Sequence, residues 1–262
     1  MSLRLEAKNA IITGGASGIG RATAIRFAEE GANVFVADRH LDAAEETAGM
    51  VRKLGRKAMA FQVDTSNEAQ VAAMVTRCVG ELGGVNILVA AAGISHARYG
   101  EEGTPAFGPL AEKPLADWKK VLSVNLDGVF ITDREVSRAM IAAGKGGRII
   151  NIASGAAKLP TPGVGEYSVS KAGVWMLTKV LAVELAQYGI TANAIGPGFI
   201  ATPMTAGLTN AEGFMKSVLE RVPLKHVGEA VDVANTALFL ASEEGRYYTG
   251  SILHPDGGVV MQ

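Results

Sequence analysis

The sequence predicts an α/β fold, in which a doubly wound parallel β-sheet of about seven strands carries helices on both faces. Short apolar runs alternate with longer amphipathic ones along all 262 residues. The short runs are almost continuously apolar, which is typical of strands that are covered on both faces. Glycines follow the amphipathic runs, where a positive φ ends a helix. No repeat or linker interrupts this alternation, so we expect a single domain over residues 1–262.

The strands and helices follow from these runs in order. Seven predicted strands cover residues 10–12, 34–36, 58–61, 87–89, 148–152, 191–195 and 251–254. Six predicted helices cover residues 20–30, 41–54, 67–82, 115–143 (with room for one break), 164–188 and 229–241. Thr65 and Glu68 have the spacing of a capping box at the start of the third helix. Right-handed crossovers between parallel strands then fix the topology.

Two connections are longer than a compact domain needs. Residues 94–117 form an extended loop rich in glycine and proline, and residues 199–227 are irregular. Long loops of this kind usually have a function. Because the first one leaves the carboxyl end of a strand, we expect it on the ligand side of the sheet. It should shape the mouth of a substrate site or a subunit contact.

Composition excludes several classes of protein. The net charge is −1 and no basic cluster occurs, which disfavours nucleic-acid binding. No run approaches the ~18 apolar residues of a membrane span, and charged residues near the start argue against a signal peptide. The single cysteine, Cys78, excludes an internal disulfide and is typical of a reducing compartment. The four histidines lack metal-ligand spacing, so we expect a cytoplasmic, globular protein without a metal.

A glycine-rich loop, residues 13–20, follows the first strand and opens into a helix. Its glycines, Gly14, Gly18 and Gly20, let backbone N–H groups approach a phosphate at the positive end of the helix. Their G-x-x-x-G-x-G spacing differs from the commoner G-x-G-x-x-G fingerprint. A tight strand-to-helix turn also needs glycine for structural reasons alone. The loop therefore predicts a dinucleotide site only together with a second signal.

Asp38 supplies this second signal at the end of the second predicted strand. An acidic group there accepts hydrogen bonds from an adenosine ribose. Its charge would repel the 2′-phosphate of NADP, so the sequence favours NAD over NADP. Arg39 stands next to it and could tolerate that phosphate in part. The alternative role for Asp38 is a capping or surface carboxylate before the helix that begins at Leu41.

Tyr167 and Lys171 stand four residues apart, on one face of a predicted helix. A phenol titrates near ~10 and an ammonium near ~10.4, so neither alone is a base at neutral pH. A cation held beside the phenol favours the phenolate and lowers the pKa of the tyrosine. When such a pair is the only signal, the alternative is that a tyrosine and a lysine occur at this spacing by chance on an ordinary helix.

Together, these residues resemble the short-chain dehydrogenase/reductase family over essentially the whole chain. The residues that carry the resemblance occur in the order of the family: the loop 13–20, Asp38, Asp64, Asn125, Ser154, Tyr167, Lys171 and Pro197-Gly198. The resemblance implies a Rossmann-type fold and an NAD(P)-dependent oxidoreductase acting on CH–OH groups. It also implies that region 199–227 is a lid over the substrate.

The resemblance assigns a role to each of four catalytic residues. Tyr167 would be the general acid/base that exchanges a proton with the substrate oxygen. Ser154 would hydrogen-bond the same oxygen, and Lys171 would lower the pKa of Tyr167 and hold the nicotinamide ribose. Asn125 would anchor a water molecule that links Lys171 to solvent.

The resemblance also implies a set of cofactor contacts. Asp64 and Thr65 would lie at the adenine, and the segment 197–202 would hold the carboxamide of the nicotinamide. The complete predicted set is Gly14, Ser17, Gly18, Ile19, Gly20, Asp38, Arg39, Asp64, Thr65, Ala91, Gly93, Tyr167, Lys171, Pro197, Gly198, Ile200 and Thr202. The chain departs from the family at Ala90-Ala91-Ala92-Gly93, where two asparagines commonly precede Ala-Gly. Side-chain hydrogen bonds that brace the neighbouring strands are therefore lost.

Function and assembly follow from the same resemblance. We expect hydride transfer between NAD and a small-molecule secondary alcohol or ketone, with no nucleic-acid or membrane partner. The alternatives are an NADP-dependent reductase of 3-oxoacyl thioesters and a non-catalytic NAD-binding sensor. The predicted helices 115–143 and 164–188 are apolar on more than one face, and in the family these helices pair between subunits. This favours a homotetramer, the alternative being deep burial within one subunit.

Overall fold

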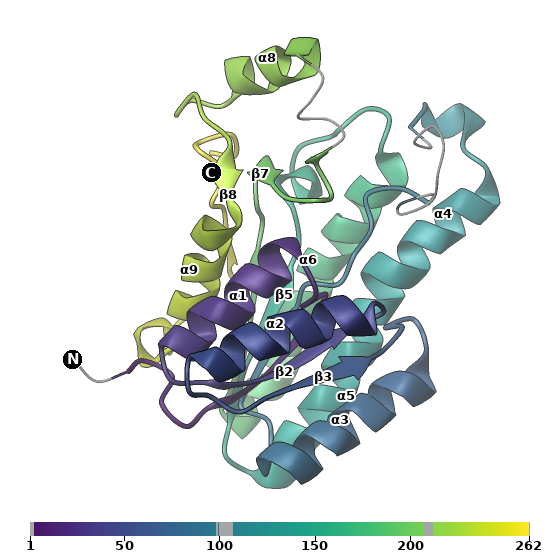
Figure 1. Cartoon of the computed structure of the whole chain (residues 1–262). Helices are drawn as coiled ribbons and strands as arrows, with labels where there is room; N and C mark the ends of the chain where they lie inside the picture. The colour runs from purple at the N-terminus through teal and green to yellow at the C-terminus, as the bar shows by residue number, and fades with distance from the viewer. Residues whose placement is uncertain (1–2, 98, 100–106, 207–211, 262) are drawn as a thin grey trace.

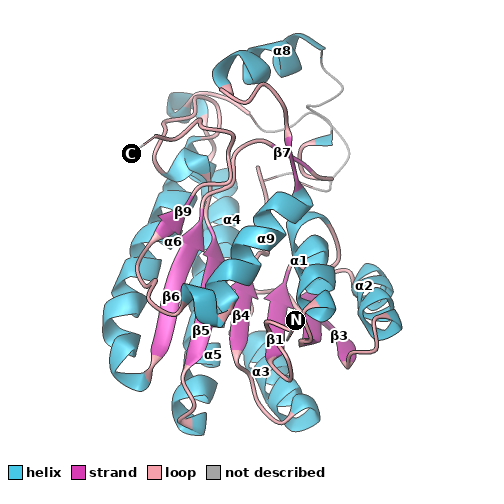
Figure 2. Cartoon of the chain, turned by 90° about the vertical axis from the view of Figure 1, so that its left-hand side faces the viewer, coloured by secondary structure: helices cyan, strands magenta, loops and turns pink. Residues whose placement is uncertain are grey.

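The centre of the structure, a computed structural model, is a seven-stranded parallel sheet (Figure 2). The structure describes residues 3–97, 99, 107–206 and 212–261. The strand order is β3-β2-β1-β4-β5-β6-β9, which confirms the predicted doubly wound α/β fold. The strands are β1 (Asn9–Thr13), β2 (Asn33–Asp38), β3 (Ala58–Gln62), β4 (Ile87–Ala90), β5 (Gly147–Ile152), β6 (Ile190–Ile195) and β9 (Ile252–Leu253).

Helices cover both faces of this sheet (Figure 1). One layer contains α1 (Gly18–Glu29), α2 (Leu41–Lys53) and α9 (Ala230–Ala241), and the other contains α3 (Glu68–Leu82), α5 (Gly128–Ala143) and α6 (Gly165–Leu185). Neighbouring strand residues point to opposite layers. Ile12 and Val34 pack in the core under α1, α2 and α9, whereas Ile11 and Phe35 pack under α3, α5 and α6. This two-sided burial is the physical reason for the continuous apolar runs.

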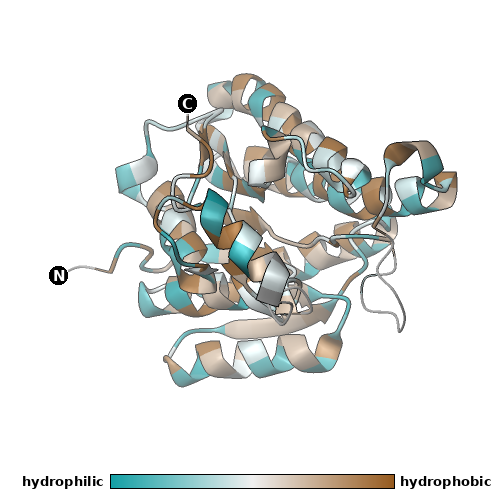
Figure 3. Cartoon of the chain, turned by 90° about the horizontal axis from the view of Figure 1, so that it is seen from above, coloured by the Kyte–Doolittle hydropathy of each residue, from teal (hydrophilic) through white to brown (hydrophobic). Residues whose placement is uncertain are grey.

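The helices meet solvent on their outer sides. Seen from above, they carry hydrophilic and hydrophobic residues close together along their length (Figure 3). No helix within the described part of the chain is long and apolar enough to cross a membrane. Cys78 is buried on α3, and this burial raises the pKa of its thiol to about 12. A thiol in this environment is an inert packing group.

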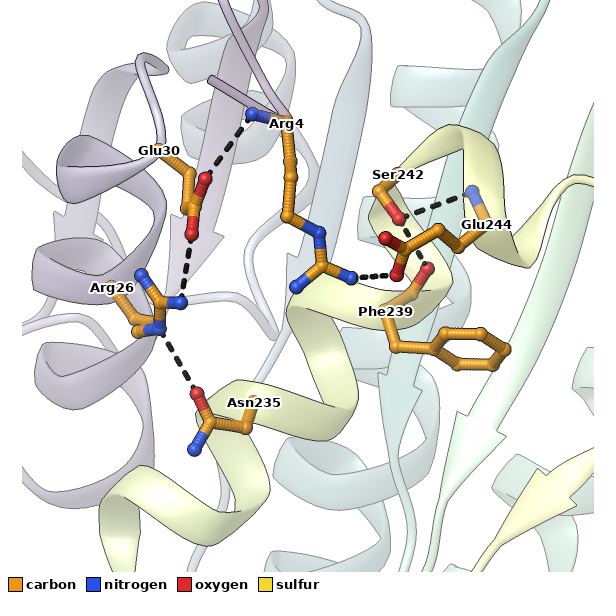
Figure 4. A network of polar contacts seen from close by, with 7 residues as sticks. All are labelled: Arg4, Arg26, Glu30, Asn235, Phe239, Ser242 and Glu244. Carbon is orange, nitrogen blue, oxygen red and sulfur yellow. Dashed lines mark hydrogen bonds and ion pairs between the residues drawn. The ribbon is translucent and has the colours of Figure 1, made fainter. Parts of the chain in front are cut away.

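A polar network ties the amino-terminal segment to α1 and α9 (Figure 4). The backbone N–H of Arg4 donates to Glu30 at 3.2 Å, and the Arg4 guanidinium forms an ion pair with Glu244. Arg26 of α1 donates to Glu30 at 2.8 Å and to Asn235 of α9 at 3.0 Å. These contacts join segments that lie more than two hundred residues apart in the sequence.

The predicted capping box at Thr65 and Glu68 is wrong. Helix α3 begins at Glu68, and its N-cap is Asn67, whose side chain accepts from the backbone N–H of Gln70 at 3.1 Å. Asparagine is among the best N-cap residues, and here its amide satisfies the free N–H directly. Thr65 is buried instead, and its hydroxyl lies against Gly128 at the start of α5.

The predicted helix 115–143 is interrupted once, by a single π-helical turn. Helix α4 (Leu115–Leu122) leads into the turn Ser123–Asp127, and α5 follows. A π-helical turn shifts the side chains relative to a regular helix and is frequent at functional sites. It places Asn125 in the interior, with no exposed surface.

The two long connections are described in part. Residues 98 and 100–106 of the connection 94–117 lie outside the described residues, as do residues 207–211 of the region 199–227. In the second region, β7 (Ile200–Ala201) pairs in parallel with β8 (Gly228–Glu229), and α8 (Glu212–Arg221) lies between them in sequence. Figure 1 places α8 beyond the carboxyl ends of the strands, which is where a lid would lie.

A buried polar cluster joins β5 to α5 and α6. Asn151 of β5 donates to Asp133 at 2.9 Å and to Thr178 at 3.0 Å. Asn151 pairs with Ala90 across β4 and β5, so these bonds brace the sheet beside the segment that lacks the asparagines of the family. Burial raises the pKa of Asp133 to about 8, and the hydrogen bond from Asn151 opposes this shift. Asp133 is therefore mostly protonated at neutral pH.

This raised pKa predicts that stability falls as pH rises. The folded state binds a proton on Asp133 up to about pH 8, whereas the unfolded carboxyl group loses its proton near ~4. The contribution of Asp133 to the free energy of unfolding is therefore complete below about pH 4 and is lost between pH 4 and 8. Asp133→Asn should flatten this dependence in urea titrations, whereas the exposed Asp127→Asn should not. Parallel curves for Asp133→Asn and the wild type would contradict the assignment.

Candidate active site

Two adjoining cavities lie at the carboxyl ends of the strands, beside the junction of β1 and β4. The strand order reverses direction at this junction, which is where open α/β sheets bind ligands. The larger cavity has a volume of about 520 Å³ and the smaller one about 110 Å³. Both are lined by Ile19, Ala91, Gly93, Thr202 and Met204, so they form one continuous site.

The glycine loop folds tightly against the floor of the larger cavity. A Cβ atom on Gly14, whose φ is +67°, would stand 2.8 Å from the backbone of Ala91. A Cβ atom on Gly20 would stand 2.1 Å from the carbonyl oxygen of Gly14. The first turn of α1 holds no acidic residue, and Ser17 makes no side-chain cap. Its backbone N–H groups and its positive end are therefore suited to the pyrophosphate of a dinucleotide.

Asp38 lines the larger cavity and also braces this loop. One carboxylate oxygen accepts from the N–H of Ala16 at 3.1 Å, and the other accepts from the N–H of His40 at 3.0 Å. Each oxygen keeps a second lone pair, so the carboxylate can still accept from ribose hydroxyls. Both roles that the sequence left open for Asp38 are therefore compatible with its position.

Asp64 lies at the same end of the larger cavity. It accepts from the hydroxyl of Ser66 at 2.6 Å and from the N–H of Ser66 at 2.9 Å. These bonds hold the pKa of Asp64 below its usual value, although partial burial opposes them. The cations of Lys120 and Arg39 add to the lowering. This end of the cavity thus carries charges of both signs.

Tyr167, Ser154 and Lys171 meet at the smaller cavity. The side chain of Ser154 lies close enough to the phenol of Tyr167 to lower its pKa, and the Nζ atom of Lys171 lies 5.7 Å from the centre of the Tyr167 ring. Burial raises the pKa of Tyr167, and the interaction with Ser154 only partly opposes this. In the protein without cofactor the pKa of Tyr167 is therefore raised, because loss of water around the phenol dominates, and the lowering of this pKa by Lys171 stays a prediction.

Lys171 is itself buried beside β5. Its Nζ atom donates to the carbonyl oxygen of Ile152 at 2.8 Å. Burial lowers the pKa of Lys171 to about 8, so the group is still largely charged at neutral pH. The fixed bond to Ile152 leaves two further N–H donors for other partners.

Asn125 lies behind the cavities rather than on their surface. Its amide accepts from the N–H of Ile94 at 2.8 Å and donates to the carbonyl oxygen of Ile94 at 2.9 Å. It also donates to the hydroxyl of Ser170 at 3.2 Å. Asn125 thus fixes the chain just after β4 against α6, and the predicted water relay through it stays a prediction.

The segment that lacks the asparagines of the family is held by backbone groups. The N–H of Ala91 donates to the carbonyl oxygen of Thr13 at 3.2 Å, and the N–H of Ala92 donates to the Thr13 hydroxyl at 3.4 Å. These bonds join the end of β4 to the start of the glycine loop. They keep Ala91 and Gly93 on the surface of the site.

The structure brings the predicted residues together at this one site. Apart from Asn125, every predicted catalytic or cofactor residue lines one of the two cavities. Sequence reasoning missed several further lining residues: His40, Ile94, Tyr99, Lys120 and Val124. Lys120 and Val124 stand four residues apart, so a helical pattern could have indicated them. Tyr99 carries no such signal, and it brings the connection 94–117 to the cavity that Asp38 lines.

No group of three or more metal-ligating side chains occurs within the described residues. The sheet topology, the cleft at its switch point and the Tyr167–Ser154–Lys171 group define the class of protein as a dinucleotide-binding oxidoreductase.

Comparison with known proteins identifies the family. A family model described as "Enoyl-(Acyl carrier protein) reductase" matches residues 14–260. The 3-oxoacyl-[acyl-carrier-protein] reductase FabG of Staphylococcus epidermidis is 37% identical over 255 residues, covering 97% of this chain and 99% of the relative. The chain belongs to the short-chain dehydrogenase/reductase family, which confirms the resemblance seen in the sequence.

Solved structures agree with this result. A short-chain type dehydrogenase/reductase from Mycobacterium marinum has a TM-score of 0.91 and 35% identity, over 100% of this chain and 98% of that one. A putative 2-deoxy-D-gluconate 3-dehydrogenase from Agrobacterium tumefaciens, solved with bound NADP, has a TM-score of 0.86 and 33% identity, over 98% of both chains. The fold is therefore shared over the full length, while the substrates in these names differ widely.

Proposed function

We propose that this protein transfers a hydride between NAD and a secondary alcohol or ketone, with Tyr167 as the general acid/base. The observation that carries the proposal is the position of the Tyr167–Ser154–Lys171 group. These side chains line the smaller cavity, which is continuous with a larger cavity lined by the glycine loop and Asp38. A dinucleotide bound along the larger cavity would present its reactive end to the smaller one.

In the reduction direction, the residues of the chain would act on the carbonyl oxygen. A bound nicotinamide supplies the hydride that goes to the carbonyl carbon. Ser154 and Tyr167 would both hydrogen-bond the oxygen, and Tyr167 would donate its proton as negative charge develops there. Lys171 would hold the cofactor ribose and stabilise the tyrosinate that remains. In the oxidation direction, the tyrosinate would take the proton from the alcohol.

The substrate class is inferred from the walls of the smaller cavity. Beside the polar groups and the segment 197–202, which is assigned to the cofactor, the cavity is lined by the apolar side chains of Ile152 and Met204. A hydrophobic ketone or secondary alcohol suits these walls better than a highly hydroxylated sugar does, since a sugar would leave hydroxyl groups without partners.

A panel of secondary alcohols with NAD, and of ketones with NADH, tests the proposal through NADH absorbance. We expect turnover of hydrophobic substrates and weak or no turnover of polyols. Dinucleotide binding without turnover of any alcohol or ketone would favour the non-catalytic sensor instead.

A second candidate is an NADP-dependent reductase of 3-oxoacyl thioesters. It is favoured by the 3-oxoacyl reductase among the relatives, by the neighbour solved with NADP, and by Arg39 and Lys120 on the larger cavity. The two candidates differ in their cofactor and in their substrate. Reduction of a 3-oxoacyl thioester with NADPH, measured beside a simple ketone with NADH, decides between them.

Asp38→Asn should relax the preference for NADH over NADPH. Each unit-charge pair at 4 Å contributes about 1 kcal/mol in water, so repulsion of a 2′-phosphate dianion amounts to about 2 kcal/mol, or about 30-fold. We therefore expect the ratio of kcat/KM values for the two cofactors to shift by at least ~10-fold. The exposed Asp42→Asn on α2 is the matched control and should not change it. A wild-type protein that prefers NADPH would support the second candidate.

We also propose a homotetramer, in which α4, α5 and α6 pack between subunits. The support is a set of exposed apolar side chains on α5 and α6, namely Phe130, Met176, Val180 and Val183. Val183 is 80% exposed in the isolated chain. Light scattering should give the mass of four chains, and Val183→Asp should reduce it. A wild-type monomer would contradict the proposal. A cytoplasmic location stays the expectation for this assembly.

A further inference from the structure

A buried ion pair lies next to the catalytic tyrosine but outside the cavities. The Nζ atom of Lys113 is 2.9 Å from a carboxylate oxygen of Glu166, and the two side chains are 5% and 0% exposed. Among the ion pairs between described residues, this one alone has both side chains almost fully buried. Glu166 directly precedes Tyr167 in the first turn of α6.

The pair belongs to a larger contact between residues 107–113 and the start of α6. The N–H of Gly108 donates to the carbonyl oxygen of Gly163 at 3.1 Å. The side chain of Leu110 lies so close to Gly165 that a Cβ atom there would stand 2.5 Å from it. Lys113 adds the third contact, through Glu166. The end of the connection 94–117 is thus seated on the turn that carries Tyr167.

The first turn of α6 needs such an external contact. The first N–H groups of a helix have no partner within it, and a side-chain cap usually fixes this end. The N-cap of α6 is Val164, which makes no side-chain cap bond. Apart from the ion pair with Lys113, the carboxylate of Glu166 has no hydrogen-bond partner among the described residues. The ion pair with Lys113 is therefore the charged interaction that orients this turn.

A buried ion pair rarely adds stability over an apolar pair of the same size, but it does define one geometry. Here that geometry concerns Tyr167, whose ring packs on Ile94, Ala97 and Val121. Its hydroxyl group must stay in reach of Ser154. A shift of the first turn would move that hydroxyl directly. Because proton transfer depends on hydrogen-bond distance, such a shift would slow the reaction.

We propose that Lys113 and Glu166 are positioning residues, which hold the first turn of α6 so that Tyr167 stays aligned with Ser154 and Lys171. The inference rests on the proposed function of Tyr167. On this inference, the connection 94–117 supports catalysis through residues 107–113, which contact the start of α6. This role is separate from the shaping of the substrate site.

The test compares Lys113→Met, Glu166→Gln and the double variant of the full-length protein. Each single change removes the charged contact between Lys113 and Glu166, and a misplacement of about 1 Å can cost about 10²-fold in rate. We expect kcat to fall by about 10- to 100-fold in the single variants, with dinucleotide affinity changed less than ~3-fold. Thermal melting and NADH fluorescence measure the fraction of each variant that is folded and binds the dinucleotide. The value of kcat is then calculated for this fraction.

The double variant Lys113→Met/Glu166→Gln is the decisive test, because it removes both buried charges of the pair together. We expect it to fold and bind NADH normally, with kcat still at least ~5-fold below the wild type and a loss smaller than the product of the single losses. The exposed pair Arg77–Glu81 is the control, and Arg77→Met/Glu81→Gln should change nothing. Wild-type kcat in the double variant, or a loss explained by the folded fraction, would overturn the inference.

Failure of this inference can be separated from failure of the proposed function. Tyr167→Phe is assayed beside these variants. If Tyr167→Phe retains full turnover, the role of Tyr167 itself is wrong. If Tyr167→Phe is inactive while the Lys113 and Glu166 variants keep their kcat, only the positioning role is wrong.

Discussion

Replacing Tyr167 by phenylalanine should lower kcat by about 10³-fold while leaving dinucleotide binding within a few-fold of the wild type. Proton transfer by a positioned side chain contributes about 10²- to 10⁴-fold to a rate. The phenylalanine ring keeps the packing against Ile94, Ala97 and Val121 but has no proton to exchange. The loss should therefore appear in turnover, and neither in stability nor in cofactor affinity. Steady-state NADH absorbance and NADH fluorescence titration measure the two quantities separately.

Two controls sharpen this experiment. Tyr247 is 99% exposed, so Tyr247→Phe should leave kcat unchanged. Ser154→Ala should lower kcat by less than Tyr167→Phe does, since Ser154 only shares the hydrogen bond to the substrate oxygen. Turnover of Tyr167→Phe close to that of the wild type would remove the basis of the catalytic assignment.

The fold could be predicted because its main determinants are local. Continuous apolar runs such as Ile11-Ile12 and Val34-Phe35 reflect the burial of each strand on both faces of the sheet. This burial does not depend on which strands lie beside it. The second predicted strand, residues 34–36, lies within β2, which ends at Asp38, the residue expected at the end of this strand. The last strand is shorter than expected, covering Ile252–Leu253, because it pairs with β6 alone at the edge of the sheet.

Features that depend on distant contacts could not be predicted. The choice of Asn67 over Thr65 as the cap of α3 depends on the burial of Thr65 against Gly128, more than sixty residues away. The position of Tyr99 at the larger cavity depends on how a long connection folds back. The ion pair of Lys113 with Glu166 joins residues that no sequence pattern relates.

The electrostatics of the site illustrate the same limit. The spacing of Tyr167 and Lys171 was enough to bring their side chains together, but it carried no information about desolvation. Lys171 is buried and Tyr167 is partly buried, and burial favours the neutral form of each group. The pKa of Tyr167 is consequently raised and that of Lys171 lowered, so the pair loses its first proton from the lysine in the free protein.

Lys171→Met should weaken dinucleotide binding by at least ~10-fold and lower kcat by about 10²-fold, because Lys171 is given two tasks. A hydrogen bond from a charged group contributes about 1.5–3 kcal/mol, which corresponds to ~10- to 150-fold in affinity. Methionine fills the volume of the buried side chain, so a loss of packing cannot produce the effect. NADH fluorescence titration and steady-state kinetics measure the two losses, and intact binding with unchanged kcat would contradict both tasks.

The lowered pKa of Lys171 adds a pH signature to this variant. Carbonyl reduction needs the fully protonated Tyr167–Lys171 pair, so its kcat/KM should fall as pH rises through about 8, while the kcat/KM of alcohol oxidation should rise. For stability the sign is opposite to that of Asp133. Between pH 8 and about 10.4 the unfolded lysine binds a proton that the folded one has released, so the free energy of unfolding rises with pH. Both dependences should vanish in Lys171→Met, and a wild-type pH profile in this variant would assign the titration to another group.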